Sequence, residues 1–194
     1  MEYWKEILGV GAVIISLLVN FPYIRDIFAG KTRPHFFTWL IWSITTAVIF
    51  FGQLVSGGGA GAWTNGVTGA FTILIALLAL KYGTKDITKS DVFFLILALC
   101  AIVLWVYTSD PLISVVLSAA IGVVGYFPTI RKTLNDPSSE TFSMYSLSVV
   151  RHALSIAALG AYSATTLAYP ILAGLMNVVM VFVIWQPWKR SKTL

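Results

Sequence analysis

Seven apolar segments separated by short polar stretches are the feature that most restricts how this chain can fold. A helix that crosses a bilayer needs about 20 mostly apolar residues, with a range of about 17–25. The segments of this kind are residues 7–27, 36–55, 63–80, 92–107, 112–130, 142–162 and 167–185. The fourth is the shortest, and the distribution of charge described below supports its inclusion. We therefore predict an all-α membrane protein with seven transmembrane helices.

The composition agrees with a bilayer as the surrounding solvent. Hydrophobic residues make up 58% of the chain and charged residues 11%, whereas a soluble domain carries about 25% charged residues. The net charge of +5 does not indicate a nucleic-acid partner, because the charges lie in short loops and the C-terminal tail and form no basic face. Cys100 is the single cysteine, which excludes an intrachain disulfide.

The basic residues alternate between the connections. Basic residues in short loops stay on the cytoplasmic side. Eleven of the thirteen fall between segments 1 and 2, 3 and 4, 5 and 6, or after segment 7: Arg25, Lys31, Arg33, Lys81, Lys85, Lys89, Arg131, Lys132, Lys189, Arg190 and Lys192. The alternation holds at every loop only with seven spans. It predicts an outside N-terminus, a cytoplasmic C-terminus, and a multi-pass protein of the cell membrane, with an organelle membrane as the alternative.

The chain repeats itself at a shift of 106 residues. The shift places Phe21, Pro22, Ile24 and Arg25 on the residues Phe127, Pro128, Ile130 and Arg131. Spans 1–3 and 5–7 are therefore copies, and span 4 is a linker that lets the second copy enter the membrane in the same orientation as the first. We expect two parallel three-helix repeats, residues 1–83 and 111–194, joined by a linker helix in residues 84–110 (a 3+1+3 layout).

This layout, with a proline near the cytoplasmic end of spans 1 and 5 and a charged loop after each, resembles the PQ-loop superfamily and its SWEET and SemiSWEET transporters. Where the family name expects Pro-Gln, the chain has Pro22-Tyr23 and Pro128-Thr129. SWEET proteins also carry prolines in spans 2 and 6, whereas here Pro34 precedes span 2 and span 6 has none. The resemblance implies a facilitator or secondary transporter that moves a small polar solute, typically a sugar, by alternating access, with Pro22 and Pro128 as gating hinges. The alternative is a static kink or a proline that merely ends the span.

Span 6 contains the residue that is most costly to place in a bilayer. Arg151 lies nine residues after Phe142, near the midplane, and no span core contains Asp or Glu. A central Arg costs about 2.5–3.5 kcal/mol on translocon scales, so we expect it to face a wet cavity or an anion. The alternative is a guanidinium that bonds carbonyls or reaches the membrane edge. Four further side chains recur around it at helical spacing: Tyr145, Ser148, His152 and Ser155.

The matched positions in span 2 form a second polar and aromatic stripe. They are Trp39, Trp42, Thr45, Thr46 and Ile49. Two facing stripes predict a central pocket, whose candidate substrate-binding residues are Arg151, His152, Asn177, Trp42, Tyr145, Ser148, Trp39 and Thr45. SWEET proteins place a substrate-binding Asn in the last span, so the resemblance favours Asn177, whose match in span 3 is Phe71. His152 and Asn177 could instead join helices, and the Trp39/Tyr145 pair could be packing.

Four expectations concern residues outside the pocket. Asn65 should cap span 3, Asn20 should satisfy backbone freed by Pro22, and the glycines at 57–59 and 61 should make their loop flexible. An aromatic belt is expected at the span ends from Trp4, Trp63, Trp185, Trp188 and Tyr169.

The sequence leaves the solute class open. The resemblance suggests a sugar, whereas the unpaired Arg151 suggests a small organic anion. The second functional hypothesis is a receptor or interaction protein that binds a ligand without transporting it. An enzyme is not expected, because no span carries a carboxylate pair, a nucleophile–base pair or metal-ligand spacing, and we predict no cofactor and no metal. The expected partners are a small-molecule solute and the lipid bilayer; the oligomeric state is not determined, and a homo-oligomer is possible.

Overall fold

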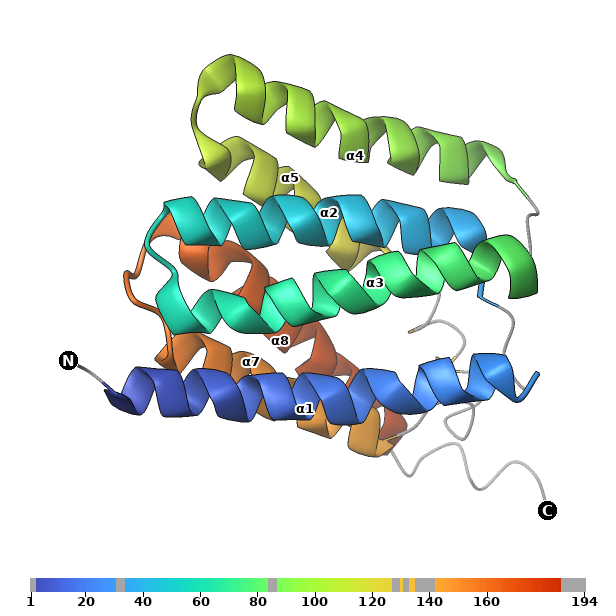
Figure 1. Cartoon of the computed structure of the whole chain (residues 1–194), viewed down its shortest axis with the longest axis horizontal. Helices are drawn as coiled ribbons and strands as arrows, with labels where there is room; N and C mark the ends of the chain where they lie inside the picture. The colour runs from blue at the N-terminus through green and yellow to red at the C-terminus, as the bar shows by residue number, and fades with distance from the viewer. Residues whose placement is uncertain are drawn as a thin grey trace.

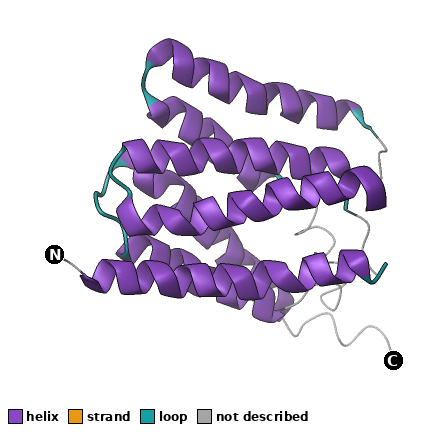
Figure 2. Cartoon of the chain, in the orientation of Figure 1, coloured by secondary structure: helices purple, strands orange, loops and turns teal. Residues whose placement is uncertain are grey.

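The computed structural model describes residues 3–30, 34–83, 87–126, 130, 133–134 and 142–185. Within these residues the chain forms seven α-helices and a short 3-10 helix (Figure 1; Figure 2). They are α1 (Tyr3–Phe28), α2 (Phe36–Val55), η1 (Gly59–Ala62), α3 (Trp63–Tyr82), α4 (Lys89–Thr108), α5 (Pro111–Val124), α7 (Phe142–Ala157) and α8 (Ala164–Trp185). The prediction of an all-α chain is therefore confirmed for this part of the molecule.

Side-chain caps fix several helix starts that the apolar pattern misplaces. At α4 the Thr88 hydroxyl accepts from the Asp91 N–H and the Asp91 carboxylate accepts from the Thr88 N–H, a reciprocal capping box. This box starts the helix three residues before the predicted 92. At α8 the Ser163 hydroxyl accepts from the Thr166 N–H at 3.2 Å, and the Thr166 hydroxyl accepts from the Ser163 N–H at 2.9 Å. Residues predicted as a loop before 167 thus belong to α8.

Helix lengths differ from the predictions at other points too, and α7 ends at Ala157 instead of the predicted 162. The fourth segment is not the shortest, because α4 has 20 residues whereas α5 has 14 and α7 has 16. α5 ends at Val124, where Gly125 donates its N–H to the Ile121 carbonyl; the predicted end was 130, and residues 127–129 lie outside the described residues. α2 begins and ends as predicted, at Phe36 and Val55.

The helices pack in two sets of three, with α4 beside them. α3 packs against both α1 and α2, and α8 packs against both α5 and α7. Between the sets, α1 lies on α7 and α2 lies on α5, while α4 covers α2 and α5. Successive helices run in alternate directions across the molecule (Figure 1). As a result α1, α3, α5 and α8 run one way and α2, α4 and α7 the other.

The segment between α2 and α3 is packed, so its predicted flexibility is wrong. Gly61 donates its N–H to the Ala158 carbonyl at 3.0 Å, and Gly160 donates to the Gly58 carbonyl at 3.1 Å. The Ser155 hydroxyl donates to the Gly61 carbonyl at 2.6 Å. A Cβ added at Gly61 would lie 2.5 Å from the Ser155 carbonyl oxygen. These glycines therefore serve close contact between η1 and α7.

A buried hydrogen-bond chain joins α2, α3 and α8 near this segment. Asn65 does not cap α3; its amide donates to the Gln53 side-chain oxygen at 2.6 Å. Gln53, fully buried, donates its own amide to the Thr166 carbonyl at 2.7 Å. Pro170 lies inside α8 four residues later and has no N–H, so it cannot bond that carbonyl. Gln53 thus supplies the donor that the proline removes.

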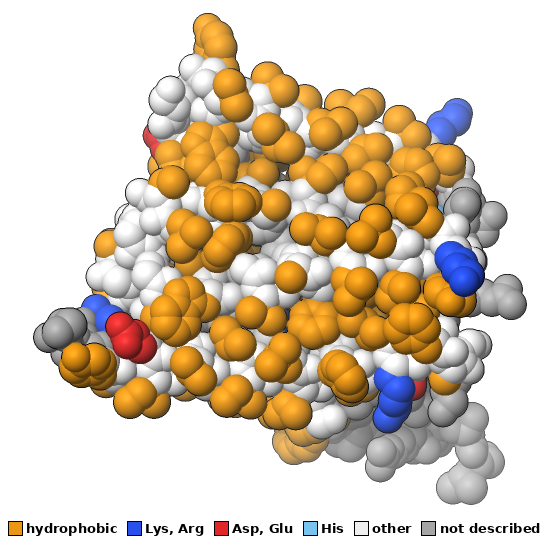
Figure 3. Space-filling view, viewed as in Figure 1, with side chains coloured by type: hydrophobic (Ala, Val, Ile, Leu, Met, Phe, Trp, Pro, Cys, Tyr) orange, Lys and Arg blue, Asp and Glu red, His pale blue; other side chains and the backbone are white. Residues whose placement is uncertain are grey.

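Hydrophobic side chains are spread over most of the visible face, and the charged side chains lie toward its edges (Figure 3). On α4, Val106 is 78% exposed and Tyr107 is 89% exposed. Soluble monomers rarely expose such large apolar areas. Among the described residues, five helices are long and apolar enough to cross a membrane, namely α1, α2, α3 (counted with η1), α4 and α8. Length and surface together are those of a membrane-embedded protein.

Candidate functional site: a polar cavity between the helices

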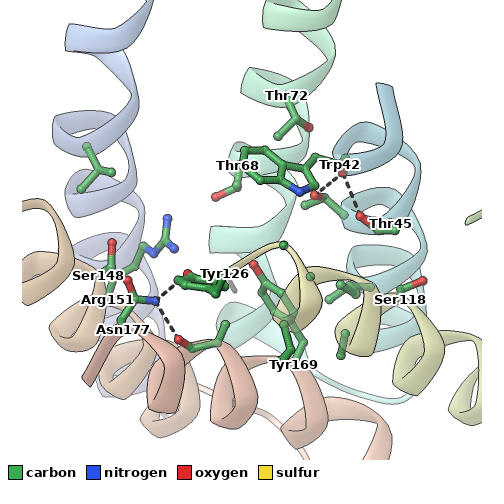
Figure 4. A pocket seen from close by; sticks show the side chains of 18 of the residues that line it. Trp42, Thr45, Thr68, Thr72, Ser118, Tyr126, Ser148, Arg151, Tyr169 and Asn177 are labelled. Atoms are coloured by element: carbon green, nitrogen blue, oxygen red, sulfur yellow. Dashed lines mark hydrogen bonds between the residues drawn. The ribbon is translucent and has the colours of Figure 1, made fainter. Parts of the chain in front are cut away.

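A cavity of about 230 Å³ lies in the interior of the bundle, lined by residues of α1, α2, α3, α5, α7 and α8 and by Tyr126 after α5 (Figure 4). Among the described residues, α4 contributes none to its wall. Seven of the eight residues predicted to bind substrate line it: Trp39, Trp42, Thr45, Tyr145, Ser148, Arg151 and Asn177. Their shared location is a geometric finding, and their role in binding stays a prediction.

The α2 wall is aromatic at one end and hydroxylic further along. Trp39 and Trp42 meet edge to face, with ring centroids 5.1 Å apart. One helical turn on, the hydroxyls of Thr45 and Thr46 donate to helix carbonyls, Thr46 to Trp42 at 2.5 Å. Because their protons are used within the helix, these hydroxyls present acceptor lone pairs to the cavity.

Arg151 on α7 is the charged residue of the cavity wall. Its side chain is buried (9% exposed), and its Nε has no hydrogen-bond partner. The prediction that Arg151 faces an interior cavity is therefore confirmed geometrically, and the alternative of reaching the membrane edge is not what the structure shows. None of the lining residues is Asp or Glu. The guanidinium thus has no carboxylate counter-ion in the described wall.

His152 does not line the cavity, which corrects its predicted place among the binding residues. It is buried behind Arg151, packed edge to face on Tyr169 at 5.7 Å between ring centroids. The Arg151 Nη2 lies 3.2 Å from the His152 Nε2. A guanidinium has only donors, so Nε2 accepts this bond and the imidazole proton is assigned to Nδ1. A neutral His152 therefore holds Arg151 without balancing its charge.

Asn177 on α8 is held by two donated bonds. Its Nδ2 donates to the Ala173 carbonyl at 2.7 Å and to the Tyr126 hydroxyl at 3.1 Å (Figure 4). The bond to Tyr126 joins α8 to the chain just after α5. Asn177 therefore connects two elements, which is one of the two roles predicted for it. Tyr126 accepts this bond and keeps its own hydroxyl proton for another partner.

Two unpartnered hydroxyls lie on the remaining walls. The hydroxyls of Thr68 on α3 and Ser118 on α5 are buried without a hydrogen-bond partner. Beside Ser118, Gly122 has open space where a Cβ would be, with nothing within 4 Å. Buried polar groups are almost always hydrogen-bonded. Unpartnered hydroxyls at a cavity wall therefore indicate room for a polar occupant.

The sequence argument missed six polar residues of the wall: Asn20, Thr68, Thr72, Ser118, Tyr126 and Tyr169. Tyr169 was assigned to the aromatic belt, but it lies within α8 and lines the cavity. Its spacing from Ala173 and Asn177 by fours could have placed it on their face. By contrast Trp4, Trp63 and Trp185 are exposed at helix ends, as predicted for a belt, and Trp188 lies outside the described residues.

The two predicted hinges have different outcomes. Pro22 lies inside α1, which continues to Phe28, so the proline does not end the helix. Pro128 lies outside the described residues. Asn20 donates to the Ser16 carbonyl at 2.8 Å and not to the Leu18 carbonyl, which is the one that Pro22 leaves without a donor.

Two kinds of search bear on what the site can be. In the described part of the chain, no group of three or more His, Cys, Asp and Glu side chains is placed to hold a metal ion. A scan against models of known protein families and searches of curated proteins and of solved structures found no match to this chain.

Proposed function

We propose that this chain is a membrane carrier for a small polar solute, a member of the PQ-loop superfamily that works by alternating access. The observation that carries the proposal is the cavity, because six of the seven described helices line it and α4 does not. Solute sites in carriers with internal repeats lie at the interface between the repeats. A cavity walled by both sets of three helices is what such a site requires.

The packing of the helices supports the 3+1+3 arrangement. In each set the third helix lies against the first and the second: α3 against α1 and α2, and α8 against α5 and α7. The contacts between the two sets also correspond. In each of them the first helix of one set packs against the second helix of the other: α1 against α7, and α5 against α2. Matched helices run in the same direction (Figure 1). Two parallel repeats related by an axis along the membrane normal would have these contacts.

The basic residues support the proposed orientation. Arg25 and Lys81 lie in the last turns of α1 and α3, and Lys89 is the first residue of α4, so all three lie at one end of the bundle. Lys5 lies near the start of α1, at the opposite end. The positive-inside rule then makes the end with Arg25, Lys81 and Lys89 cytoplasmic. In this orientation Pro22 is near the cytoplasmic end, where a gating hinge would act.

The test is flux into proteoliposomes that contain the purified chain. Gly122→Phe should place a ring in the cavity, because the position faces open space, and should lower uptake of labelled lactate or glucose at least tenfold. Gly122→Ala is the small-residue control; it should keep flux and gain up to about 1 kcal/mol of helix stability. Val106→Phe, on the exposed face of α4, is the control for adding a ring elsewhere.

The outcomes separate the two functional hypotheses. Wild-type flux that survives Gly122→Phe would contradict transport through this cavity. Solute binding by the wild type without any flux would favour the receptor hypothesis over the carrier.

A further inference from the structure

The positive charge of Arg151 in the cavity wall indicates which class of solute the cavity binds. This inference rests on the proposed function. Arg151 is the charged residue of its described wall, and the Nε of its guanidinium has no partner. A guanidinium stays protonated at any physiological pH, so it cannot escape burial by losing its charge. Removing such a charge from water without a paired anion is costly. The anion that balances Arg151 is not supplied by a carboxylate of the described wall.

The residues around Arg151 hold it in place without neutralising it. The Nη2 of Arg151 donates to the Nε2 of His152 at 3.2 Å, and accepting this bond leaves the imidazole neutral. The ring of His152 is in turn packed against Tyr169. The guanidinium is therefore held on one side by His152, while Arg151 lines the cavity without a carboxylate partner in the described wall.

Other donors in the wall match an oxygen-rich anion. The hydroxyls of Thr68 and Ser118 are unpartnered, and Tyr126 retains its proton because it accepts from Asn177. These three hydroxyls come from different elements that share the cavity wall with Arg151 (Figure 4). Charge-assisted hydrogen bonds to a carboxylate are stronger than neutral ones.

The rest of the wall favours an organic anion over an inorganic one. Trp39, Trp42 and Tyr169 present aromatic surface to the same space, which suits a short carbon skeleton. The volume of about 230 Å³ is below the about 300–1,000 Å³ of pockets that hold drug-sized ligands. A single guanidinium balances a single negative charge.

We propose that the cavity binds a small organic monoanion, a carboxylate on a short carbon chain, with Arg151 as its counter-ion. The carboxylate accepts from the Arg151 guanidinium and from the wall hydroxyls, and the aromatic side chains contact its carbon chain.

The experiment measures binding by the purified full-length protein with calorimetry. The anionic probes are acetate, lactate and malate, and the neutral probes are lactamide, which matches lactate in shape, and glucose. Lactate or acetate should bind at least tenfold more tightly than lactamide and glucose, and malate, with its second charge, more weakly than lactate. This comparison uses the wild type alone and does not depend on any variant folding.

Variants then assign the effect to Arg151. Arg151→Gln should weaken lactate binding at least tenfold and leave lactamide binding unchanged, whereas Arg151→Lys, which keeps the charge, should retain part of the affinity. Lys81→Gln removes a positive charge outside the cavity and should leave lactate binding unchanged. An unaltered lactate affinity in Arg151→Gln would overturn the proposal.

Two further results would distinguish a failure of the anion assignment from a failure of the proposed carrier function. Flux of glucose together with no binding by any anionic probe would overturn the anion assignment and keep the carrier. Binding of lactate through Arg151 without flux in proteoliposomes would keep the anion site and remove the carrier function.

Discussion

Arg151 and His152 are adjacent in the sequence but have different surroundings. Arg151 reaches the cavity, whereas His152 is buried beside Tyr169 of α8. The histidine accepts a bond from the guanidinium. In the proposed site, His152 would therefore affect a solute only indirectly, through the position of Arg151.

This arrangement predicts separate results for two substitutions of His152. His152→Phe keeps the ring but removes the acceptor, which leaves a second buried nitrogen of Arg151 unpaired and should cost about 1–3 kcal/mol of stability. Lactate affinity should fall several-fold in the same variant. His152→Gln keeps an acceptor and should lose less of both. Calorimetry and thermal unfolding measure the two quantities, and wild-type affinity in both variants would exclude a positioning role.

The spacing of polar residues along one helix could predict much of the cavity wall. Trp39, Trp42 and Thr45 share a face of α2, and Tyr145, Ser148 and Arg151 share a face of α7, because three- and four-residue steps return to the same side. Thr68 and Thr72 on α3, and Ser114 and Ser118 on α5, also lie four residues apart, but small hydroxyl side chains at this spacing are equally typical of helix–helix contacts in a membrane. Only the way α3 and α5 pack against the others brings Thr68, Thr72 and Ser118 to the cavity.

At the scale of helices, α2 and α8 are joined because a side chain of α2 supplies a hydrogen-bond donor that α8 lacks. Pro170 deprives the Thr166 carbonyl of its donor within α8, and Gln53 of α2 donates to it at 2.7 Å. The other end of the Gln53 amide accepts from Asn65 of α3 at 2.6 Å. One buried side chain thereby joins three helices.

A double-mutant cycle tests this exchange. Gln53→Leu leaves the Thr166 carbonyl and the Asn65 amide unpaired, each at a cost of about 1–3 kcal/mol. Pro170→Ala restores an N–H that can bond Thr166 within α8. Gln53→Leu should therefore destabilise the Pro170→Ala background by less than it destabilises the wild type, as measured by thermal or denaturant unfolding. Equal costs in both backgrounds would mean that Gln53 does not replace the missing donor.

Helix starts were predictable where a local signal exists. The Thr88/Asp91 box and the Ser163/Thr166 pair are both visible in the sequence, and they place the starts of α4 and α8 better than the apolar pattern does. The fixed conformation of the glycine segment 57–61 could not be predicted from a local signal of this kind. The hydrogen bonds of its glycines go to residues 53 and 54 and to residues 155, 158 and 160, and the second of these groups is nearly one hundred residues away in the chain.

At the scale of the whole molecule, the ends of the bundle differ in charge. Arg25, Lys81 and Lys89 lie at one end, while the turn between α4 and α5 at the other end contains Asp110 and no basic residue. The proposed position of the protein in the bilayer rests on this difference in charge and on the apolar surface between the two ends.

Thiol labelling tests the orientation. In a Cys100→Ala background, Asp110→Cys should react with a membrane-impermeant maleimide added outside intact cells, whereas Lys81→Cys should react only after the membrane is opened. Both side chains are exposed, so access to reagent depends on the side of the membrane. The reverse pattern of labelling would invert the proposed topology, and labelling of both from outside would contradict an odd number of crossings between them.

Gln53 supplies the hydrogen-bond donor that Pro170 removes, and this has a consequence for the proposed repeat of two three-helix halves. Under the shift of 106 residues, Gln53 corresponds to Leu159 and Pro170 to Thr64. Under the proposed repeat, two copies of the first half would bring two glutamines and no proline at the position of Pro170. Two copies of the second half would bring two such prolines and no glutamine. The proposed halves thus contribute unlike partners to this joint, and two copies of either half would lack it.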